Sequence, residues 1–160
     1  MTFAANTATP PAILLVDDDP DARMILRDAA AEAVPGATIW EVGSGEEAMD
    51  FLYARGRHSR APRPSLITLD IEMPGEGGQT TLAKIRRDGR FADIPVVVLT
   101  SRADDVQKRL AAVNGANSFA LKPATPAELG AAIRQITEYW TQLHQRPACE
   151  DTDGPTTASA

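Results

Sequence analysis

The stretch "LITLDIEMPGEGG", residues 66–78, decides the fold class, because an apolar run ends abruptly in a single carboxylate. Leu66, Ile67 and Leu69 form a run without a polar face, which predicts a strand buried on both faces of a sheet. Asp70 follows where this run stops, and a loop rich in Pro and Gly comes next. A charge at the rim of a buried strand is costly unless something binds it. Asp70 is therefore a candidate functional residue.

The pattern of an apolar strand followed by a helix occurs five times along the chain. The predicted strands cover residues 12–16, 37–42, 65–69, 94–100 and 117–121, and the predicted helical segments cover residues 19–33, 43–56, 78–89, 102–116 and 126–145. Strands of this continuous apolar kind, alternating with helices, predict a parallel sheet covered on both faces. Right-handed crossovers make the fold α/β and doubly wound. The flavodoxin-like strand order 2-1-3-4-5, (βα)5, is expected for five such units.

Helix-start signals mark three of the predicted helices. Asp19 precedes Pro20 and is interpreted as the cap of the first helix rather than as a metal ligand. Ser44 is followed three residues later by Glu47, which predicts a capping box. Thr125 is expected to cap the last helix. These local signals agree with the boundaries that the apolar pattern predicts.

Length and composition limit the classes of protein that fit. The chain has 160 residues and a formal net charge of −6, which predicts one domain and argues against nucleic acid as the main partner. We expect a flexible arm over residues 1–11, a folded domain over 12–145 and a disordered acidic tail over 146–160. Cys149 is the single cysteine, so no intrachain disulfide can form. The cysteine usage, the lack of a secretory signal and the lack of a membrane-spanning run predict a cytoplasmic protein that contacts no membrane.

Polar side chains collect at the strand ends that face the crevice of such a sheet. In the predicted strand order, ligands bind outside the carboxyl ends of the strands, where strands 1 and 3 adjoin. Strand 1 is followed by Asp17 and Asp18, strand 3 by Asp70, strand 4 ends in Thr100 and strand 5 is followed by Lys122. Three neighbouring carboxylates would repel one another unless a divalent cation is bound. All-oxygen ligands suit Mg²⁺, with Mn²⁺ as a substitute.

This set of residues fits phosphoryl transfer. Asp70 has the place of a nucleophile that forms an acyl phosphate. The metal, Lys122 and Thr100 would neutralise the oxygens of the moving phosphoryl group. We also expect Glu72 and Arg102 to flank the mouth of the site on the loops after strands 3 and 4, where their charges could pair.

The residues that carry this chemistry resemble the receiver domains of two-component response regulators. "LLVDDDPDAR", "LITLDIEMPGEGG", "VVVLTS" and "FALKPA" fall in the order of that family. The resemblance implies a phosphoacceptor that is not an enzyme in the ordinary sense, because it only catalyses its own phosphorylation and slow dephosphorylation. It also implies a role for each matching position: Asp17 and Asp18 as the metal-binding acidic pair, Asp70 as the phosphoacceptor, Glu72 as a metal ligand through its backbone carbonyl, Thr100 as the switch hydroxyl, Phe119 as the switch aromatic and Lys122 as the phosphate-binding lysine.

A narrower resemblance concerns the partner. "GRHSRAPRPSLITLD", "GANSFALKPA" and "ITEYW" are similar to single-domain regulators paired with bacterial and cyanobacterial phytochromes. It implies a sensor histidine kinase as partner, a bacteriophytochrome, and a homodimer. Along the last helix, apolar residues continue to Trp140 and Leu143, and we expect its final turns to overhang the domain. Tyr139, Trp140 and Leu143 are the predicted interface residues.

Three other functions remain open from the residues. A flavodoxin-like electron carrier would share the fold, but it needs a phosphate-binding loop where this chain has three aspartates. A small Mg²⁺-dependent aspartyl-phosphate phosphatase would use Glu72, two residues after the nucleophile, as general acid. A DNA-binding regulator would need a further domain after residue 145, for which about fifteen residues are too few.

Overall fold

The computed structural model describes residues 10–101 and 104–143. Its strands are β1 (Ala12–Val16), β2 (Thr38–Val42), β3 (Leu66–Asp70), β4 (Val96–Thr100) and β5 (Ser118–Leu121). Its helices are α1 (Pro20–Ala33), α2 (Gly45–Leu52), α3 (Gly77–Arg87), α4 (Asp105–Val113) and α5 (Pro126–Glu138), with a short 3-10 helix η1 (Gly56–His58) and a π-helical turn η2 (Tyr139–Leu143). The strands pair in parallel in the order β2-β1-β3-β4-β5, which confirms the predicted flavodoxin-like fold. The predicted arm, apart from Pro10 and Pro11, and the predicted tail lie outside the described residues.

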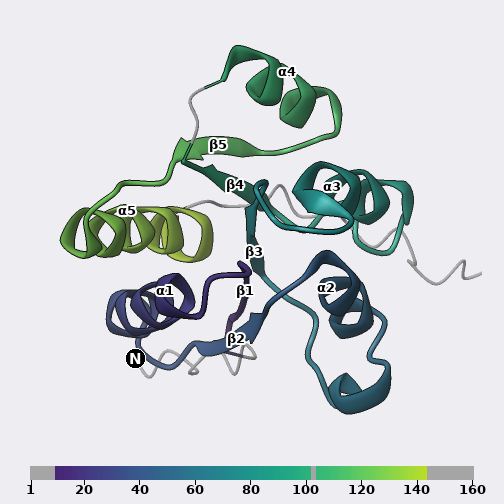
Figure 1. Ribbon diagram of the computed structural model, residues 1–160. Coiled ribbons are helices and arrows are strands. Elements are labelled where there is room, and N and C mark those ends of the chain that lie inside the picture. The colour runs from purple at the N-terminus through teal and green to yellow at the C-terminus, as the bar shows by residue number, and fades with distance from the viewer. Residues whose placement is uncertain (1–9, 102–103, 144–160) are drawn as a thin grey trace, which may run out of the picture.

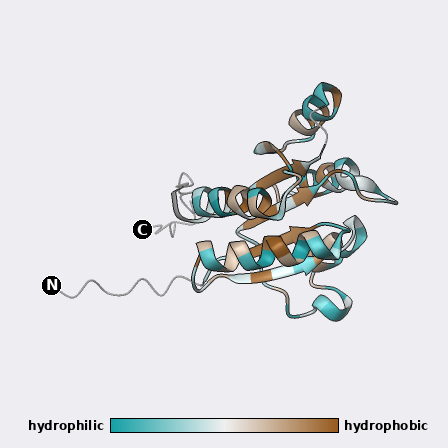
Figure 2. Cartoon of the chain, turned by 60° about the vertical axis from the view of Figure 1, so that its left-hand side comes forward, coloured by the Kyte–Doolittle hydropathy of each residue, from teal (hydrophilic) through white to brown (hydrophobic). Residues whose placement is uncertain are grey.

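The helices form a layer on each face of the sheet (Figure 1). Alternate strand residues such as Ile13 and Leu15 pack with α1 and α5 on one face. Leu14 and Val16 point to the other face, where they join a core that α2 and α3 cover. The central strands β1, β3 and β4 are buried along their whole length, and the interior of the sheet carries the hydrophobic colour, while hydrophilic residues gather on the outward surfaces of the helices (Figure 2). The sheet therefore holds its carboxyl-end residues on a rigid base.

Packing is uneven across the sheet. All residues of β1, β3 and β4 are buried, whereas β5 is half-buried and Leu121 at its end is 54% exposed. Ala111 is the buried residue of α4. The large apolar side chains Val106, Leu110 and Val113 of the same helix are exposed. The β5–α4 side of the domain is thus attached to the core by fewer buried side chains than the centre of the sheet.

The helix starts follow the predicted caps, with one shift. Ser44 accepts a hydrogen bond from the backbone N–H of Glu47 at 3.1 Å, as a capping box requires. The Glu47 carboxylate, however, accepts from the N–H of Gly43 at 3.0 Å, one residue earlier than the motif predicts. Asp19 accepts from the N–H of Asp21 at 2.9 Å and caps α1, which confirms its interpretation as a cap.

The end of the last helix differs from the prediction. The α-helix ends at Glu138, and the chain continues as the π-helical turn η2 up to residue 143. The Thr137 hydroxyl donates to the carbonyl of Ile133 at 2.8 Å, and the Thr141 hydroxyl donates to the carbonyl of Thr137. Such hydroxyl groups compete with backbone donors and widen a helical turn. Trp140 is half-buried against the core between α1 and α5, so it does not overhang the domain uncovered as the sequence suggested.

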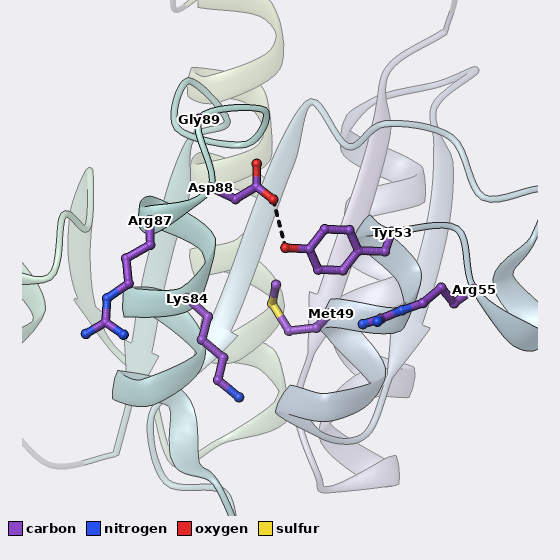
Figure 3. A pocket seen from close by; sticks show the side chains of 7 residues that line it. All are labelled: Met49, Tyr53, Arg55, Lys84, Arg87, Asp88 and Gly89. Carbon is purple, nitrogen blue, oxygen red and sulfur yellow. Dashed lines mark hydrogen bonds between the residues drawn. The ribbon is translucent and has the colours of Figure 1, made fainter.

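A groove of about 550 Å³ lies between the C-terminal ends of α2 and α3 (Figure 3). In it the Tyr53 hydroxyl donates to Asp88 at 2.7 Å, and Arg90 pairs with the same carboxylate at 2.7 Å. Hydrogen bonds from Arg90 and Tyr53 hold the pKa of Asp88 far below its usual range. Helices in this fold run opposite to the strands, so the groove lies at the far edge of the sheet from Asp70. It is separate from the predicted site.

Candidate functional site

The acidic residues that the sequence singled out converge at the carboxyl edge of the sheet. Asp17 directly follows β1 and Asp70 ends β3, the neighbouring strand. Each of Asp17, Asp18 and Asp70 offers a carboxylate oxygen, and these three oxygens lie within 4.8 Å of one another. Asp17 and Asp70 are buried and Asp18 is exposed. The structure therefore brings together the three acids that were predicted to share a cation.

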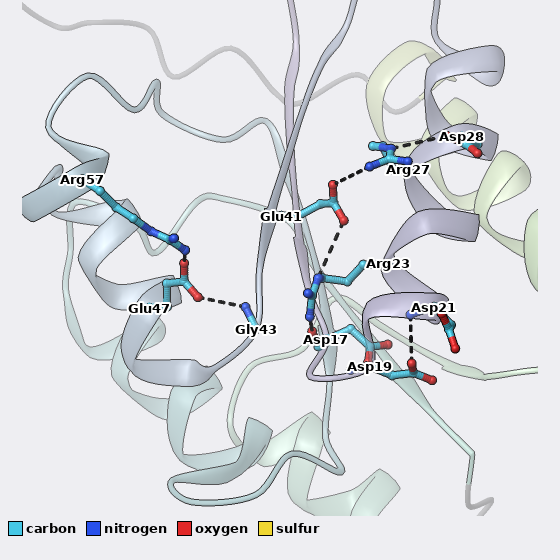
Figure 4. Close-up of polar contacts among 10 residues, drawn as sticks. All are labelled: Asp17, Asp19, Asp21, Arg23, Arg27, Asp28, Glu41, Gly43, Glu47 and Arg57. Carbon is cyan, nitrogen blue, oxygen red and sulfur yellow. Dashed lines mark hydrogen bonds and ion pairs between the residues drawn. The ribbon is translucent and has the colours of Figure 1, made fainter.

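Asp17 is held from four sides. Its Oδ1 accepts from the N–H of Asp19 at 2.9 Å, and its Oδ2 accepts from Nζ of Lys122 at 2.6 Å. Its N–H donates to the carbonyl of Val42 at 3.2 Å, and its own carbonyl accepts from Nη1 of Arg23 at 2.7 Å. Figure 4 shows the Arg23 side chain between Asp17 and Glu41. Nε of Arg23 forms an ion pair with Glu41 at 3.7 Å. These contacts fix the first acid of the pair in place.

The negative charge of Asp70 is compensated by fewer contacts than that of Asp17. Its Oδ1 accepts from the N–H of Glu72 at 2.9 Å, and its Oδ2 lies 3.6 Å from Nζ of Lys122. The pKa of Asp70 is raised to about 6, first by burial and then by the charges of Asp17 and Asp18, while the Glu72 N–H and Lys122 act in the opposite direction. A carboxylate that is costly to ionise is one that an added cation stabilises.

Lys122 connects the acidic cluster to β4. Burial lowers the pKa of Lys122, but the hydrogen bond and charge of Asp17, with the charge of Asp70, outweigh it and raise the pKa above its ordinary value. The ammonium group is therefore charged. The N–H of Lys122 also donates to the carbonyl of Thr100 at 2.6 Å, so Thr100 and Lys122 lie side by side.

The donor set suits a small divalent cation. Three carboxylates face one lysine, which leaves excess negative charge in a partly buried place. Mg²⁺ and Mn²⁺ prefer oxygen ligands and keep several water molecules, for which the exposed side of Asp18 leaves room. Asp17, Asp18 and Asp70 are the side chains that would hold the ion. The backbone carbonyl of Glu72 remains a predicted further ligand.

The turn after β3 is packed too tightly for a side chain at Gly78. A Cβ atom there would lie 2.3 Å from the carbonyl oxygen of Asp70. The N–H of Gly78 donates to the carbonyl of Ile71 at 3.2 Å, which brings the start of α3 against the end of β3. A glycine at this position therefore allows α3 to pack beside the acceptor.

Glu72 contacts two hydroxyl groups at the end of β4. The Thr100 hydroxyl donates to Oε1 of Glu72 at 3.4 Å, and the Ser101 hydroxyl donates to Oε2. Arg102, which was expected to pair with Glu72, lies outside the described residues. Phe119 is half-buried and packs against the core beneath α2 and α3. Thr100 is thus buried at the end of β4 beside Lys122, whereas Phe119 lies on the half-buried strand β5.

Sequence reasoning missed two arginines. Arg23 holds the carbonyl of Asp17, as described above. Arg86 donates to the carbonyls of Gly115 at 2.7 Å and Ile94 at 2.8 Å and to the side chain of Asn117 at 2.6 Å, so it joins α3 to the start of β4 and to the turn before β5. In the sequence Arg86 is one of several basic residues at a helix end. Nothing in that pattern distinguishes it from a solvated side chain.

The sequence matches the response regulator receiver domain family over residues 13–134. The chain therefore belongs to the family of response regulator receiver domains. It is 33% identical over 136 residues to the "Probable methanogenesis regulatory protein FilR2" of Methanothrix harundinacea, which covers 84% of this chain and 86% of that protein. The chain spans about half the length of transcriptional regulators that it also matches.

Two solved structures of response regulators, one of them a phytochrome response regulator, are similar to this one. The phosphorylated cyanobacterial regulator RcpA has a TM-score of 0.81 and 29% identity, covering 87% of this chain and 99% of RcpA. The Mn²⁺-bound form of Rcp1, a protein of Synechocystis, has a TM-score of 0.79 and 27% identity, covering 87% of this chain and all of that chain, 100%. Family membership does not favour the electron carrier or the phosphatase. Within the described residues, no helix combines the length and apolarity that crossing a bilayer requires.

Proposed function

We propose that this chain is a response regulator that accepts a phosphoryl group on Asp70 from a sensor histidine kinase and signals through protein contacts. The observation that carries the proposal is the place of Asp70, buried at the end of β3 between an acidic pair and Lys122. A buried carboxylate with a raised pKa, beside a cation and a metal-binding set, is suited to nucleophilic attack on phosphorus.

The transfer is one displacement at phosphorus. A carboxylate oxygen of Asp70 forms a bond to phosphorus while the bond from phosphorus to the imidazole nitrogen of the donor breaks. The released imidazole keeps the electron pair and takes a proton from water. Lys122, 3.6 Å from Oδ2 of Asp70, is placed to pair with the phosphoryl oxygens, and Thr100 brings a hydroxyl donor to the same edge.

Asp17, Asp18 and Asp70 would hold Mg²⁺, or Mn²⁺ in its place. When bound, the ion supplies positive charge next to the phosphoryl oxygens. The N–H of Asp19 and the guanidinium of Arg23 hold Asp17 in place. Lys122, which bonds to Asp17 at 2.6 Å, is within reach of both the acid pair and the acceptor.

We further propose that the protein turns over no external substrate. The phosphatase alternative needs Glu72 as a general acid aimed at a leaving group. In the structure the Glu72 carboxylate accepts from the hydroxyls of Thr100 and Ser101 instead. Release of phosphate from a generic phosphomonoester, at many turnovers per protein, would favour the phosphatase.

We propose that the kinase is a phytochrome and that this chain meets it in the cytoplasm. This follows the similarity to RcpA and Rcp1, which extends over nearly the whole of both proteins. We also propose a homodimer through the end of α5 and η2. Tyr139 is 49% exposed there, beside a hollow of about 430 Å³ that Ile136 and Trp140 also line, and its ring meets that of Trp140 edge-on at 5.1 Å. The third predicted interface residue is Leu143, whose side chain lies outside the part of the chain that the structure describes.

The test uses the full chain with a low-molecular-weight acyl-phosphate donor and Mg²⁺. We expect a mass gain of one phosphoryl group that a chelator prevents. Asp70→Asn should not gain it, whereas Asp50→Asn, a change at an exposed acid on α2, should gain it normally. Transfer from a phosphorylated phytochrome kinase, and its absence from an unrelated kinase, would then test the partner.

A further inference from the structure

The hydroxyls of Thr100 and Ser101 are engaged by a group that carries the same charge as a phosphoryl group. Both donate to the two carboxylate oxygens of Glu72, which comes from the loop after β3. Thr100 is buried at 1% exposure and ends β4, whereas Glu72 and Ser101 are exposed. The exposed side chain of Glu72 therefore joins the loop after β3 to the end of β4 through these two hydroxyls.

The acceptor carboxylate and Thr100 lie at the ends of neighbouring strands, β3 and β4. Asp70 precedes Glu72 by two residues, and its Oδ1 accepts the Glu72 N–H at 2.9 Å. Leu99, adjacent to Thr100, is the partner of Asp70 in the β3–β4 register. A hydroxyl has one proton to donate. Thr100 therefore cannot donate fully to Glu72 and to a phosphoryl oxygen at the same time.

We propose, on the basis of the function proposed above, that the Glu72 carboxylate is an internal competitor of the phosphoryl group for the hydroxyl of Thr100, with Ser101 as its second anchor. Glu72 thus holds the Thr100 hydroxyl in the unphosphorylated state and opposes its donation to a phosphoryl group on Asp70. The phosphoryl group wins because it offers three acceptor oxygens and more negative charge than one carboxylate. The contact of Glu72 with Thr100, at 3.4 Å, is longer than an ordinary O–H···O hydrogen bond, and the contact with Ser101 is the shorter of the two.

The probe is beryllofluoride with Mg²⁺, a stand-in for the phosphoryl group, titrated into the full chain and followed by fluorine NMR. Glu72→Ala should lower the half-saturating concentration by about three- to tenfold, the fold-change expected for the net contribution of one ordinary hydrogen bond. Ser101→Ala should shift it in the same direction but less. Glu76→Gln is the matched control, because Glu76 is an acid of the same loop that pairs with Lys84 and contacts neither hydroxyl.

A double-mutant cycle separates competition from simple charge repulsion. In a Thr100→Ala background the hydroxyl is gone, so Glu72→Ala should change the half-saturating concentration by less than about twofold. A full effect in that background would overturn the proposal and leave repulsion as the cause. No effect of Glu72→Ala in the native background would also overturn it. If the native protein forms no adduct, or if Asp70→Asn forms one, the proposed function itself has failed; the circular dichroism of each variant shows whether it is folded.

Discussion

The strands that hold the acidic cluster and the strand that leads to Lys122 are packed in different ways. β1 and β3, which end beside the acids, are buried along their whole length. β5, which leads to Lys122, is half-buried, and the neighbouring α4 buries Ala111 while exposing three large apolar side chains. We infer that the two parts have different roles. The tightly packed half, with β1 and β3, fixes the acceptor and the metal ligands, and the less packed half, with β5 and α4, can change its conformation when the site changes. Thr100 lies between the two halves, at the end of β4, which pairs with β3 on one side and with β5 on the other.

The largest expected effect comes from the rigid half. Ile67→Ala in β3 should lower the free energy of unfolding by about 2–5 kcal/mol, because it leaves a cavity in a fully buried strand. Leu121→Ala in β5, at a 54% exposed position, should stay within about 0.5 kcal/mol. Urea titration of both variants measures the two values. Equal losses at the two positions would remove the contrast between the halves.

Arg86 joins the two halves. Its replacement should therefore lower the free energy of unfolding by less than the core cavity of Ile67→Ala and by more than the surface change Leu121→Ala. Arg86→Met keeps the length of the side chain but loses the hydrogen bonds to Gly115, Ile94 and Asn117. We expect a loss of about 1–3 kcal/mol in unfolding free energy. Hydrogen exchange should rise most in the turn before β5. Arg87→Met, at the next and exposed position, is the control; an equally large loss there would contradict the assigned role.

Asp70 should make stability depend on pH. Its pKa is raised in the folded protein, from an ordinary 3.8 to about 6, so its contribution to stability is complete below about pH 4 and is lost as the pH rises through 6. Asp70→Asn removes this loss. In a chelating buffer the variant should be more stable than the native chain by about 1–2 kcal/mol at pH 7, allowing for screening by solvent, and equal to it near pH 4. If Asp70→Asn were less stable than the native chain at pH 7, the ionised Asp70 carboxylate would not be destabilising the fold.

The smallest effect concerns the proposed dimer. Tyr139→Ala removes an exposed ring at the end of α5 while leaving Trp140 in its place against the core, so it tests the interface with little damage to the fold. We expect the dimer to weaken about fivefold, or about 1 kcal/mol. Sedimentation equilibrium over a range of concentrations measures the change. A native chain that remains monomeric at high micromolar concentration would refute the dimer.

The fold was predictable because its signals are local and repeated. Five apolar runs alternate with capped helices, and the strand order follows from the handedness of the crossovers. The acids, Thr100 and Lys122 were predictable as neighbours because parallel strands place their carboxyl ends at one edge. Where side chains point was not predictable in the same way. Whether Glu72 meets Arg102, a metal or two hydroxyls depends on loop geometry that residue spacing does not determine.

Two misses have physical causes that single-sequence patterns do not carry. The stripe of apolar residues in α5 predicted an uninterrupted helix, but hydroxyls of Thr137 and Thr141 compete for backbone carbonyls and alter the last turn. The role of Arg86 depends on three segments meeting in space, the longest separation in sequence being 31 residues, from Arg86 to Asn117. Its basic character alone predicts a solvated helix end.

The most direct test of the central claim is to find which residue carries the phosphoryl group. The protein is loaded with an acyl-phosphate donor and Mg²⁺ and then treated with borohydride, which reduces an aspartyl phosphate to homoserine, and the product is located by peptide mass spectrometry. We expect homoserine at position 70 and unmodified aspartate at positions 17 and 18. Homoserine at either of those positions, or a phosphoryl group recovered on a residue other than Asp70, would contradict it.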